Sequence, residues 1–327
     1  MIQIFLIPRR IMGCIKRSIP LFRYLGIRVA FPLLVYEIRK VCLPVPKQYR
    51  ILEKKHQYIE NYLRERYIPI VNRYKNEPAK PCEPVFEEKP IWICWWQGYE
   101  NMPDVLKECV ESIRRNAGKH PVTLISKINY AEFVDIPQVV LERLESGSLI
   151  LQHFADILRC CLLERYGGLW MDATLYVTKK IPEYYFNSPF FSLKSIPIDN
   201  SSVSCYRWST FLLGTNGATS FFSCLTDLLI AYVSQHSKEI DYLLIDYFMD
   251  IMFQSNPEYE KLLENLPISN LQLHQLRLYL NKAYDEKEYK KITRDTLVFK
   301  LTYKWKLLDY TKEGKPTFYN HLLNRSF

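Results

Sequence analysis

Paired cysteines, long apolar runs, internal repeats and low-complexity segments are all missing from this sequence. Nine cysteines occur in 327 residues, but none belongs to a CxxC pair or to a zinc-finger spacing. An odd number of scattered cysteines, most with apolar neighbours, is typical of small buried side chains in a reducing compartment. The pattern argues against a disulfide-stapled secreted protein and a zinc module, and it favours a cytoplasmic location.

A membrane-spanning helix is also missing, because no stretch reaches the roughly 18 to 20 uninterrupted apolar residues that one needs. The closest stretch, residues 25–46, is interrupted by Arg28, Pro32, Glu37 and Arg39. The first twenty residues mix apolar and charged side chains without signal-peptide order or a cleavage site. We therefore expect a protein that neither spans the membrane nor carries a signal peptide.

Positive charge is concentrated at the N-terminal end. Residues 1–55 contain twelve Lys or Arg and two Glu, about +10, whereas the whole chain carries +9. Five prolines divide this region, which predicts short basic amphipathic helices on the anionic inner face of the cell membrane. A helical arm packed on the main body, with solvated arginines, is the alternative. Nucleic-acid binding is disfavoured because the basic region lacks a binding motif or suitable fold context.

The order of the predicted elements indicates an α/β fold. A helical period over residues 49–74 is followed by a linker with four prolines at 75–90, so we divide the chain into an arm with linker, 1–84, and a main domain, 85–327. The main domain begins with alternating strands and helices, predicted at residues 90–98, 102–118, 120–127 and 135–147. This alternation predicts a mainly parallel sheet, and from about residue 220 the pattern becomes helical.

Ligands of such sheets bind at the carboxyl ends of the strands. In the segment "LILQHFADILRCCLLERYGGLWMDAT", Asp156 and Arg159 are i,i+3 neighbours on a predicted helix, which Gly167 and Gly168 end. The predicted strand at 169–177 then places Asp172 among apolar neighbours. A carboxylate there is costly unless it is paired or liganded.

This combination of side chains suits a nucleotide sugar. An Arg fork binds phosphate in a bidentate manner, a carboxylate accepts hydrogen bonds from sugar hydroxyls, and a second carboxylate can hold a divalent metal beside a diphosphate. Glycines let backbone and ligand approach closely. The alternative for Asp156 and Arg159 is an ion pair on the helix surface with no role in binding.

The segment "FADILRCCLLERYGGLWMDAT" resembles the "A-D-x-x-R … GG-x-W/Y-x-D" signature of the glycosyltransferase family 32 group. Over roughly residues 85–310 the chain is similar to the bacterial branch of this group, the capsular polysaccharide synthesis proteins. Supporting pieces are "IWICWWQGYENMP", "DYFMD" at 246–250 and "KLTYK" at 300–304.

The resemblance implies a GT-A-type, Rossmann-like domain that binds a nucleotide sugar, usually UDP-linked, with Mn²⁺ or Mg²⁺, and that retains anomeric configuration. It implies that Asp156 holds sugar hydroxyls and that Arg159 contacts the sugar or diphosphate. Asp172, the first acid of the family's DxD motif, would contact ribose, sugar or metal. These three are the expected catalytic residues.

Further donor contacts are expected from the same resemblance. Trp95 is placed to stack on the nucleobase, although Trp92 or Trp96 is an alternative and Trp95 also suits a core position. The other expected donor-binding residues are Gln97, Gly168, Asp246 and His274.

The sequence departs from the family pattern at the second acid of the DxD motif, which is Thr174 in "DAT". A hydroxyl is a weaker ligand than a carboxylate for a hard cation. The expected metal-binding residues are therefore Asp172 and Thr174, with His321 near the C-terminal end as a further candidate.

These observations predict a retaining glycosyltransferase that uses a nucleotide-sugar donor, with a UDP-sugar as the expected one. The expected acceptor is a saccharide or lipid-linked oligosaccharide at the inner membrane face, in capsular or surface polysaccharide synthesis. The alternative is a non-catalytic, membrane-associated assembly protein on a decayed transferase fold.

Overall fold

The computed structural model describes residues 2–42, 45–75, 77, 82–198 and 202–324. Its seven strands in these ranges are β1 (Ile91–Cys94), β2 (Val122–Ile125), β3 (Gly168–Met171), β4 (Leu175–Val177), β5 (Phe191–Ser192), β6 (Leu212–Thr215) and β7 (Val298–Lys300). The helices of the main body are α4 (Asp104–Asn116), α5 (Gln138–Glu145), α6 (Leu151–Tyr166), α7 (Tyr184–Asn187), α8 (Phe221–Gln235), α9 (Leu244–Ser255), α10 (Pro257–Glu264), α11 (Glu286–Thr293) and α12 (Phe318–Asn324). Single 3₁₀ turns are η1 (Tyr99–Asn101), η2 (Tyr130–Glu132) and η3 (Leu276–Leu278).

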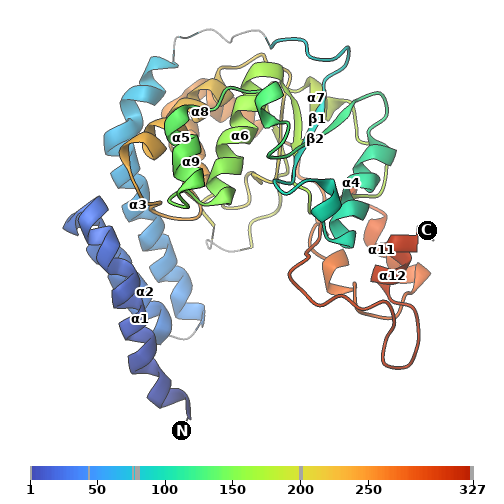
Figure 1. Ribbon diagram of the computed structural model, residues 1–327, viewed down its shortest axis with the longest axis horizontal. Coiled ribbons are helices and arrows are strands. Elements are labelled where there is room, and N and C mark those ends of the chain that lie inside the picture. Colours follow the sequence, from blue (N-terminus) through green and yellow to red (C-terminus); the bar gives the residue numbers. More distant parts are fainter. Residues whose placement is uncertain (1, 43–44, 76, 78–81, 199–201, 325–327) are drawn as a thin grey trace.

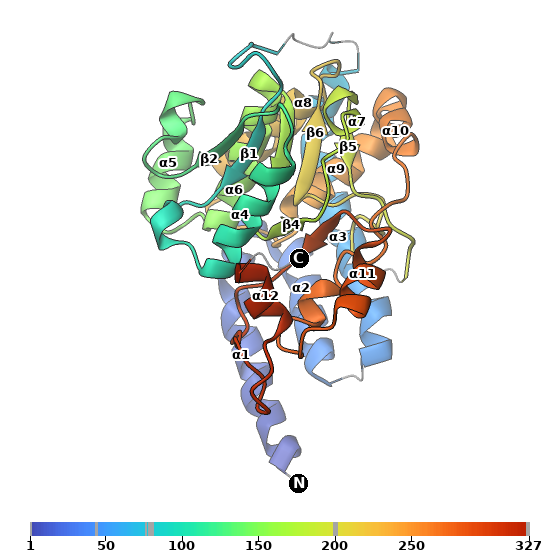
Figure 2. The ribbon, with the colours of Figure 1, turned by 90° about the vertical axis from the view of Figure 1, so that its right-hand side faces the viewer.

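A five-stranded sheet in the order β2-β1-β3-β6-β5 forms the centre of the molecule. Strands β2, β1 and β3 run parallel, whereas β6 and β5 add antiparallel pairs. Helix α4 lies in front of the sheet in Figure 2, and α6, α8 and α9 lie behind it. The α/β fold class is confirmed, and the parallel part of the sheet is the side formed by β2, β1 and β3.

The strand predicted at residues 169–177 is two strands in two sheets. Strand β3 ends at Met171, a turn follows in which the Leu175 amide donates to the Asp172 carbonyl at 2.9 Å, and β4 then pairs antiparallel with β7. The prediction of one continuous strand was wrong. Asp172 therefore lies in the turn at the carboxyl end of β3, where a carboxylate can face a cavity, rather than inside a buried strand.

The arm consists of three helices, α1 (Ile2–Leu25), α2 (Ile27–Cys42) and α3 (Val45–Arg73) (Figure 1). The predicted division into short helices by prolines was wrong, because Pro20 lies within α1 and Pro32 within α2. The break between α1 and α2 comes instead at Gly26, with φ 74°. No helix within the described ranges combines the length and apolar character that crossing a bilayer requires.

Helix α3 packs against α8 and α9 of the main body. Tyr67 is buried there, its ring meeting the edge of Phe248 at 5.3 Å between centroids, and its hydroxyl donates to Gln235. The described part of the predicted linker, from residue 82 onward, is irregular, and residues 76 and 78–81 lie outside the described residues. The division into domains at residue 84 stays a prediction.

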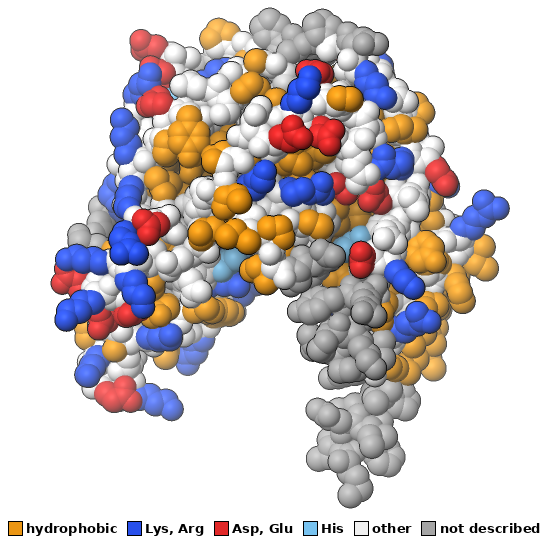
Figure 3. Space-filling view, turned by 180° about the vertical axis from the view of Figure 1, so that it is seen from behind, with side chains coloured by type: hydrophobic (Ala, Val, Ile, Leu, Met, Phe, Trp, Pro, Cys, Tyr) orange, Lys and Arg blue, Asp and Glu red, His pale blue; other side chains and the backbone are white. Residues whose placement is uncertain are grey.

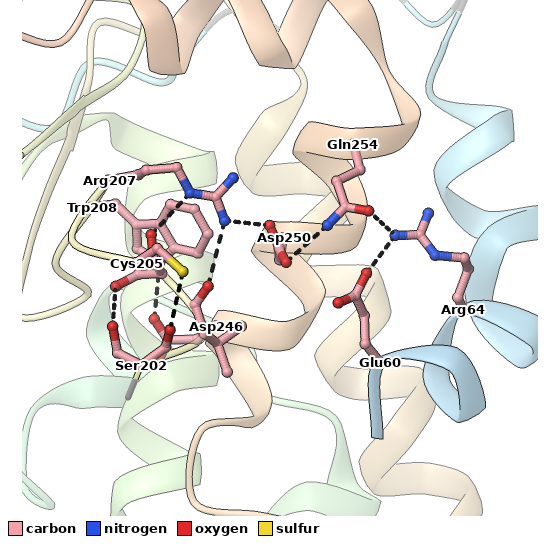
Figure 4. A network of polar contacts seen from close by, with 11 residues as sticks. Glu60, Arg64, Ser202, Cys205, Arg207, Trp208, Asp246, Asp250 and Gln254 are labelled. Atoms are coloured by element: carbon pink, nitrogen blue, oxygen red, sulfur yellow. Dashed lines mark hydrogen bonds and ion pairs between the residues drawn. The ribbon is translucent and has the colours of Figure 1, made fainter. Parts of the chain in front are cut away.

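A chain of polar contacts joins α3 to the loop before β6 (Figure 4). Arg64 on α3 donates to Gln254, whose amide donates to Asp250 at 2.9 Å. The other Asp250 oxygen accepts from Arg207 at 2.6 Å. The next residue, Trp208, donates its indole N–H to Asp246 at 2.9 Å. Asp246 is the residue of this chain of contacts that lines the cavity described next.

Candidate active site

A cavity of about 670 Å³ opens at the carboxyl ends of β1 and β3. Its size is within the range of sites for small molecules and cofactors. Its lining comes from many places in the chain: residues 94–97 at the end of β1, one side of α6, Trp170 with the turn at 172–174, residues 210–211 before β6, the start of α9 with the two residues before it, Arg277, and the segment 300–304. Seven of the predicted site residues line it: Trp95, Gln97, Asp156, Arg159, Asp172, Thr174 and Asp246.

Arg159 is held rigidly in the cavity wall. Its side chain is 8% exposed, and one terminal nitrogen donates to the Thr210 carbonyl. The other terminal nitrogen lies 3.1 Å from Asp156 and 3.6 Å from Asp172, and the guanidinium lies 5.0 Å from the Trp170 ring centroid. Burial raises the pKa of Asp156, although Arg159 acts in the opposite direction. The i,i+3 pair is therefore part of the cavity and not a solvated surface pair.

Asp172 joins the two sides of the cavity. One carboxylate oxygen accepts from the Trp170 indole at 3.0 Å, and the other accepts from the Lys300 ammonium at 2.7 Å. Burial raises the pKa of Asp172, but Lys300 and Arg159 outweigh burial and leave this pKa below its ordinary value. Asp172 is thus an ionised carboxylate with two cations beside it.

Asp246 has the opposite electrostatic environment. Burial raises its pKa to about 7, with a further increase from Asp156, against the hydrogen bond from Trp208. Asp246 forms no salt bridge with any described residue, and its carboxylate accepts a hydrogen bond from the Trp208 indole. Near neutral pH the cavity therefore contains two carboxylates that differ in protonation, Asp172 ionised and Asp246 partly protonated.

Several polar atoms at this cavity have no hydrogen-bond partner among the described residues. They are Trp95 Nε1, Arg159 Nε, Thr174 Oγ1 and Arg277 Nε. Each can donate a proton, and a buried donor without an acceptor costs free energy. The lining also contains four basic side chains against three carboxylates, the basic ones being Arg159, Arg277, Lys300 and Lys304. An acceptor-rich anion fits this combination.

Three predicted residues do not line the cavity. Gly168 begins β3 at the end of the strand away from the cavity, and a Cβ there would lie 2.2 Å from the Pro90 carbonyl oxygen, so this glycine allows close strand packing. His274 lies outside the lining, before η3. His321 stacks on Tyr284 with ring centroids 3.6 Å apart, on α12.

The three tryptophans considered for stacking on the nucleobase differ in their surroundings. Trp92 is fully buried, and its indole donates to the Gly167 carbonyl at 2.9 Å. Trp96 lines the cavity but packs against Phe154. Trp95 faces Tyr303 edge to face at 5.6 Å and keeps its unpaired N–H at the cavity.

Among the lining residues to which sequence reasoning gave no role are Tyr242, Arg277, Lys300 and Lys304. The "KLTYK" run entered only as a supporting piece of the resemblance, with no role for its lysines. A signal was present, because Lys300 follows three apolar residues in a strand, as Asp172 does. Two opposite charges in separate apolar strands can indicate a buried pair.

The described side chains offer a poor ligand set for a divalent metal. No group of three or more His, Cys, Asp or Glu within the described ranges is arranged to hold an ion. Asp172 already binds Lys300, and Thr174 contributes only a hydroxyl. His321 is engaged elsewhere, on α12. The expectation of Mn²⁺ or Mg²⁺ stays a prediction, which this arrangement does not favour.

A comparison with protein families shows which family the chain belongs to. The model of the capsular polysaccharide synthesis protein family matches residues 39–322, so the chain belongs to that family. This confirms the branch named in the resemblance, whereas the wider family 32 grouping and the DxD role of Asp172 stay predictions.

Two curated fungal proteins share part of the sequence. The O-glycosyltransferase braB of Annulohypoxylon truncatum is 29% identical over 113 residues, 32% of this chain and 27% of that protein. The O-glycosyltransferase PaGT of Phomopsis amygdali is 34% identical over 112 residues, 32% of this chain and 28% of that protein. The matched segment spans only about a quarter of the length of these relatives.

Among solved structures, the chain is similar to the PaToxG glycosyltransferase, with TM-score 0.39, 13% identity, and coverage of 77% of this chain and 99% of that one. It is also similar to the bifunctional enzyme WbbM, with TM-score 0.41, 12% identity, and coverage of 75% and 50%.

Proposed function

We propose that this protein is a retaining glycosyltransferase on a GT-A-type fold, which transfers a sugar from a UDP-sugar to a saccharide or lipid-linked oligosaccharide in surface polysaccharide synthesis. The observation that carries the proposal is the set of unpaired donors in the cavity, on Trp95, Arg159, Thr174 and Arg277, beside the carboxylate of Asp156. The donors suit a diphosphate, and the carboxylate suits sugar hydroxyls. Membership of the capsular polysaccharide synthesis family supports the same class of reaction.

In this proposal the new bond forms between an acceptor hydroxyl oxygen and the anomeric carbon of the sugar. The bond from that carbon to the diphosphate oxygen breaks on the same face, and the departing phosphate takes the hydroxyl proton. Arg159 stabilises the negative charge on the leaving diphosphate, because it is fixed before the reaction begins. Asp156 orients the sugar, and Trp95 stacks on the base.

The proposal is tested by slow hydrolysis of a UDP-sugar by the purified protein. We expect Asp172→Asn to abolish it, because the amide loses the charge that holds Lys300 and faces Arg159. Thermal unfolding of the variant checks that it is folded. Full hydrolysis by folded Asp172→Asn protein would rule out the assigned site. A thermal-shift series of nucleotide sugars then identifies the donor, since ligand binding to the native state raises its stability.

A second candidate is a non-catalytic assembly protein, favoured by Thr174 at the place of the motif's second acid. This candidate requires that the cavity binds no nucleotide. Calorimetry with UDP and with UDP-sugars, with and without Mn²⁺, distinguishes the two. Absence of binding under every condition favours the assembly protein.

We also propose that the arm binds the anionic inner face of the cell membrane, near a lipid-linked acceptor. Exposed apolar side chains on α1 and α2, Ile19, Ile27 and Phe31 among them, lie on the same helices as the exposed Arg23 and Arg28. Hydrophobic and basic side chains are neighbours on the part of the arm seen in Figure 3. This mixture suits the boundary between headgroups and acyl chains.

The membrane role is tested by sedimentation with vesicles that contain anionic lipid. The double change Arg23→Glu with Arg28→Glu should release the protein, while Arg23→Lys with Arg28→Lys keeps it bound. UDP-sugar hydrolysis should persist in both variants, because neither Arg23 nor Arg28 lines the cavity. Unchanged sedimentation of the charge-reversed variant refutes the membrane role.

A further inference from the structure

Asp172 has two fixed cations beside it where a transferase motif would be expected to bind a metal. Lys300 Nζ lies 2.7 Å from one of its oxygens, and an Arg159 nitrogen lies 3.6 Å from the other. The Lys300 side chain is 21% exposed and faces the cavity. An ammonium has three protons to donate, so one bond to Asp172 leaves donors for a ligand.

The backbone holds Lys300 at this place. Strand β7 pairs with β4 so that Lys300 is opposite Leu175, and the Leu301 amide donates to the Thr174 carbonyl at 2.9 Å. The Lys300 amide itself donates to the Leu273 carbonyl at 2.8 Å. Hydrogen bonds therefore tie this residue to the motif turn and to the segment before Arg277. The backbone thus fixes the position of Lys300 in the cavity wall.

A divalent cation and these side chains compete for the same carboxylate. A metal bound to Asp172 would have to displace the Lys300 ammonium or remain next to it and to Arg159, with like charges in contact. Thr174 Oγ1, which lines the cavity without a partner among the described residues, can donate to a phosphate oxygen without any metal. The positive charge that a diphosphate needs is already present in the wall.

We propose that Lys300, together with Arg159, occupies the place of the divalent metal and neutralises the donor diphosphate, so that donor binding is independent of metal. The proposal rests on the proposed function, because it assumes a nucleotide-diphosphate ligand. Asp172 then acts as a positioning residue that holds the ammonium in the cavity. Thr174 in "DAT" belongs to the same arrangement, since a second acid there would offset the charge of Lys300.

The first test is calorimetry of the full chain with UDP, either in EDTA or with millimolar Mn²⁺ or Mg²⁺. We expect dissociation constants that agree within about twofold under the three conditions. Binding that appears only with metal would overturn this inference and leave the proposed function standing. Absence of binding under all three conditions would overturn both.

The second test uses Lys300→Ala, with Lys306→Ala as the control from the same segment but outside the cavity lining. In EDTA the Lys300→Ala protein should bind UDP about tenfold more weakly or worse, a loss typical of a charged hydrogen bond. Mn²⁺ should restore much of this affinity, because Asp172 is then free to coordinate it. The Lys306→Ala protein should behave as wild type.

Lys300→Arg keeps the charge and serves if Lys300→Ala does not fold, as judged by thermal unfolding. We expect Lys300→Arg to bind UDP in EDTA within about fivefold of wild type, because charge rather than shape carries the contact. A Lys300→Ala protein that folds and binds UDP in EDTA as wild type does would overturn the inference. So would Mn²⁺ that restores nothing to it.

Discussion

The two walls of the cavity are built differently. The motif wall comes from one short piece of chain, in which α6 presents Asp156 and Arg159 and the turn after β3 presents Asp172. The C-terminal wall, with Arg277 and Lys300, comes from distant segments that β7 brings back to the turn. The motif wall is specified locally, while the C-terminal wall depends on a pairing between strands far apart in sequence.

The largest expected effect concerns the close packing behind the motif wall. Gly168→Ala places a Cβ 2.2 Å from the Pro90 carbonyl oxygen at φ 88°, and we expect a loss of roughly 3 kcal/mol in the free energy of unfolding. Gly314→Ala in the C-terminal segment is the control, since its φ is 77° and no atom lies within 4 Å of the new Cβ; it should lose about 1 kcal/mol. Urea unfolding measures the free energy lost by each variant. Equal losses would contradict the close packing of Gly168 behind the motif wall.

The next effect concerns the guanidinium of the motif wall. Arg159→Lys keeps the charge but loses the planar fork that reaches Thr210, Asp156 and Asp172. We expect UDP affinity, measured by calorimetry, to fall about tenfold. Lys304→Ala, an exposed residue at the rim of the C-terminal wall, should change it by less than about threefold. The reverse order of effects would mean that the C-terminal wall dominates donor binding.

The smallest effect is a pH dependence from Asp246. Its pKa of about 7 in the folded state lies above the ordinary value of 3.8, so the native state keeps a proton that the unfolded chain releases. The stability due to this group is full at low pH and falls as the pH rises towards 7. Asp246→Asn removes this dependence while keeping an acceptor for Trp208. The melting temperature of the variant relative to wild type should increase between about pH 5 and pH 8, and a constant difference would refute the shift.

Local sequence was sufficient for the motif wall because the relevant signals are short-range. The i,i+3 spacing of Asp156 and Arg159 places them together on any helix, and the glycine pair ends that helix, with positive φ at both Gly167 and Gly168. Strand β1 was also placed well enough to bring Trp95, which follows it, to the cavity. The α/β class followed from the alternation of strands and helices.

The features of the fold and site that were not predicted depend on long-range contacts, which no local sequence pattern indicates. The break between β3 and β4 was missed because the apolar residues continue on both sides of Asp172, although the two strands belong to different sheets. Pro20 and Pro32 were expected to divide the arm, but packing of α1 on α2 and of α2 on α3 outweighs the cost of an interior proline. Lys300 was missed as a partner of Asp172 because 128 positions separate them.

The pairing of β4 with β7 has a consequence for folding. Contacts between residues this far apart close a large loop, and such contacts tend to form late because the entropy of closure is lost before they give stability. The motif turn is therefore synthesised, and its helix can form, long before the strand that contributes Lys300 leaves the ribosome. During that interval Asp172 lacks its ammonium partner, and the cavity acquires its final charge only when the C-terminal strand docks.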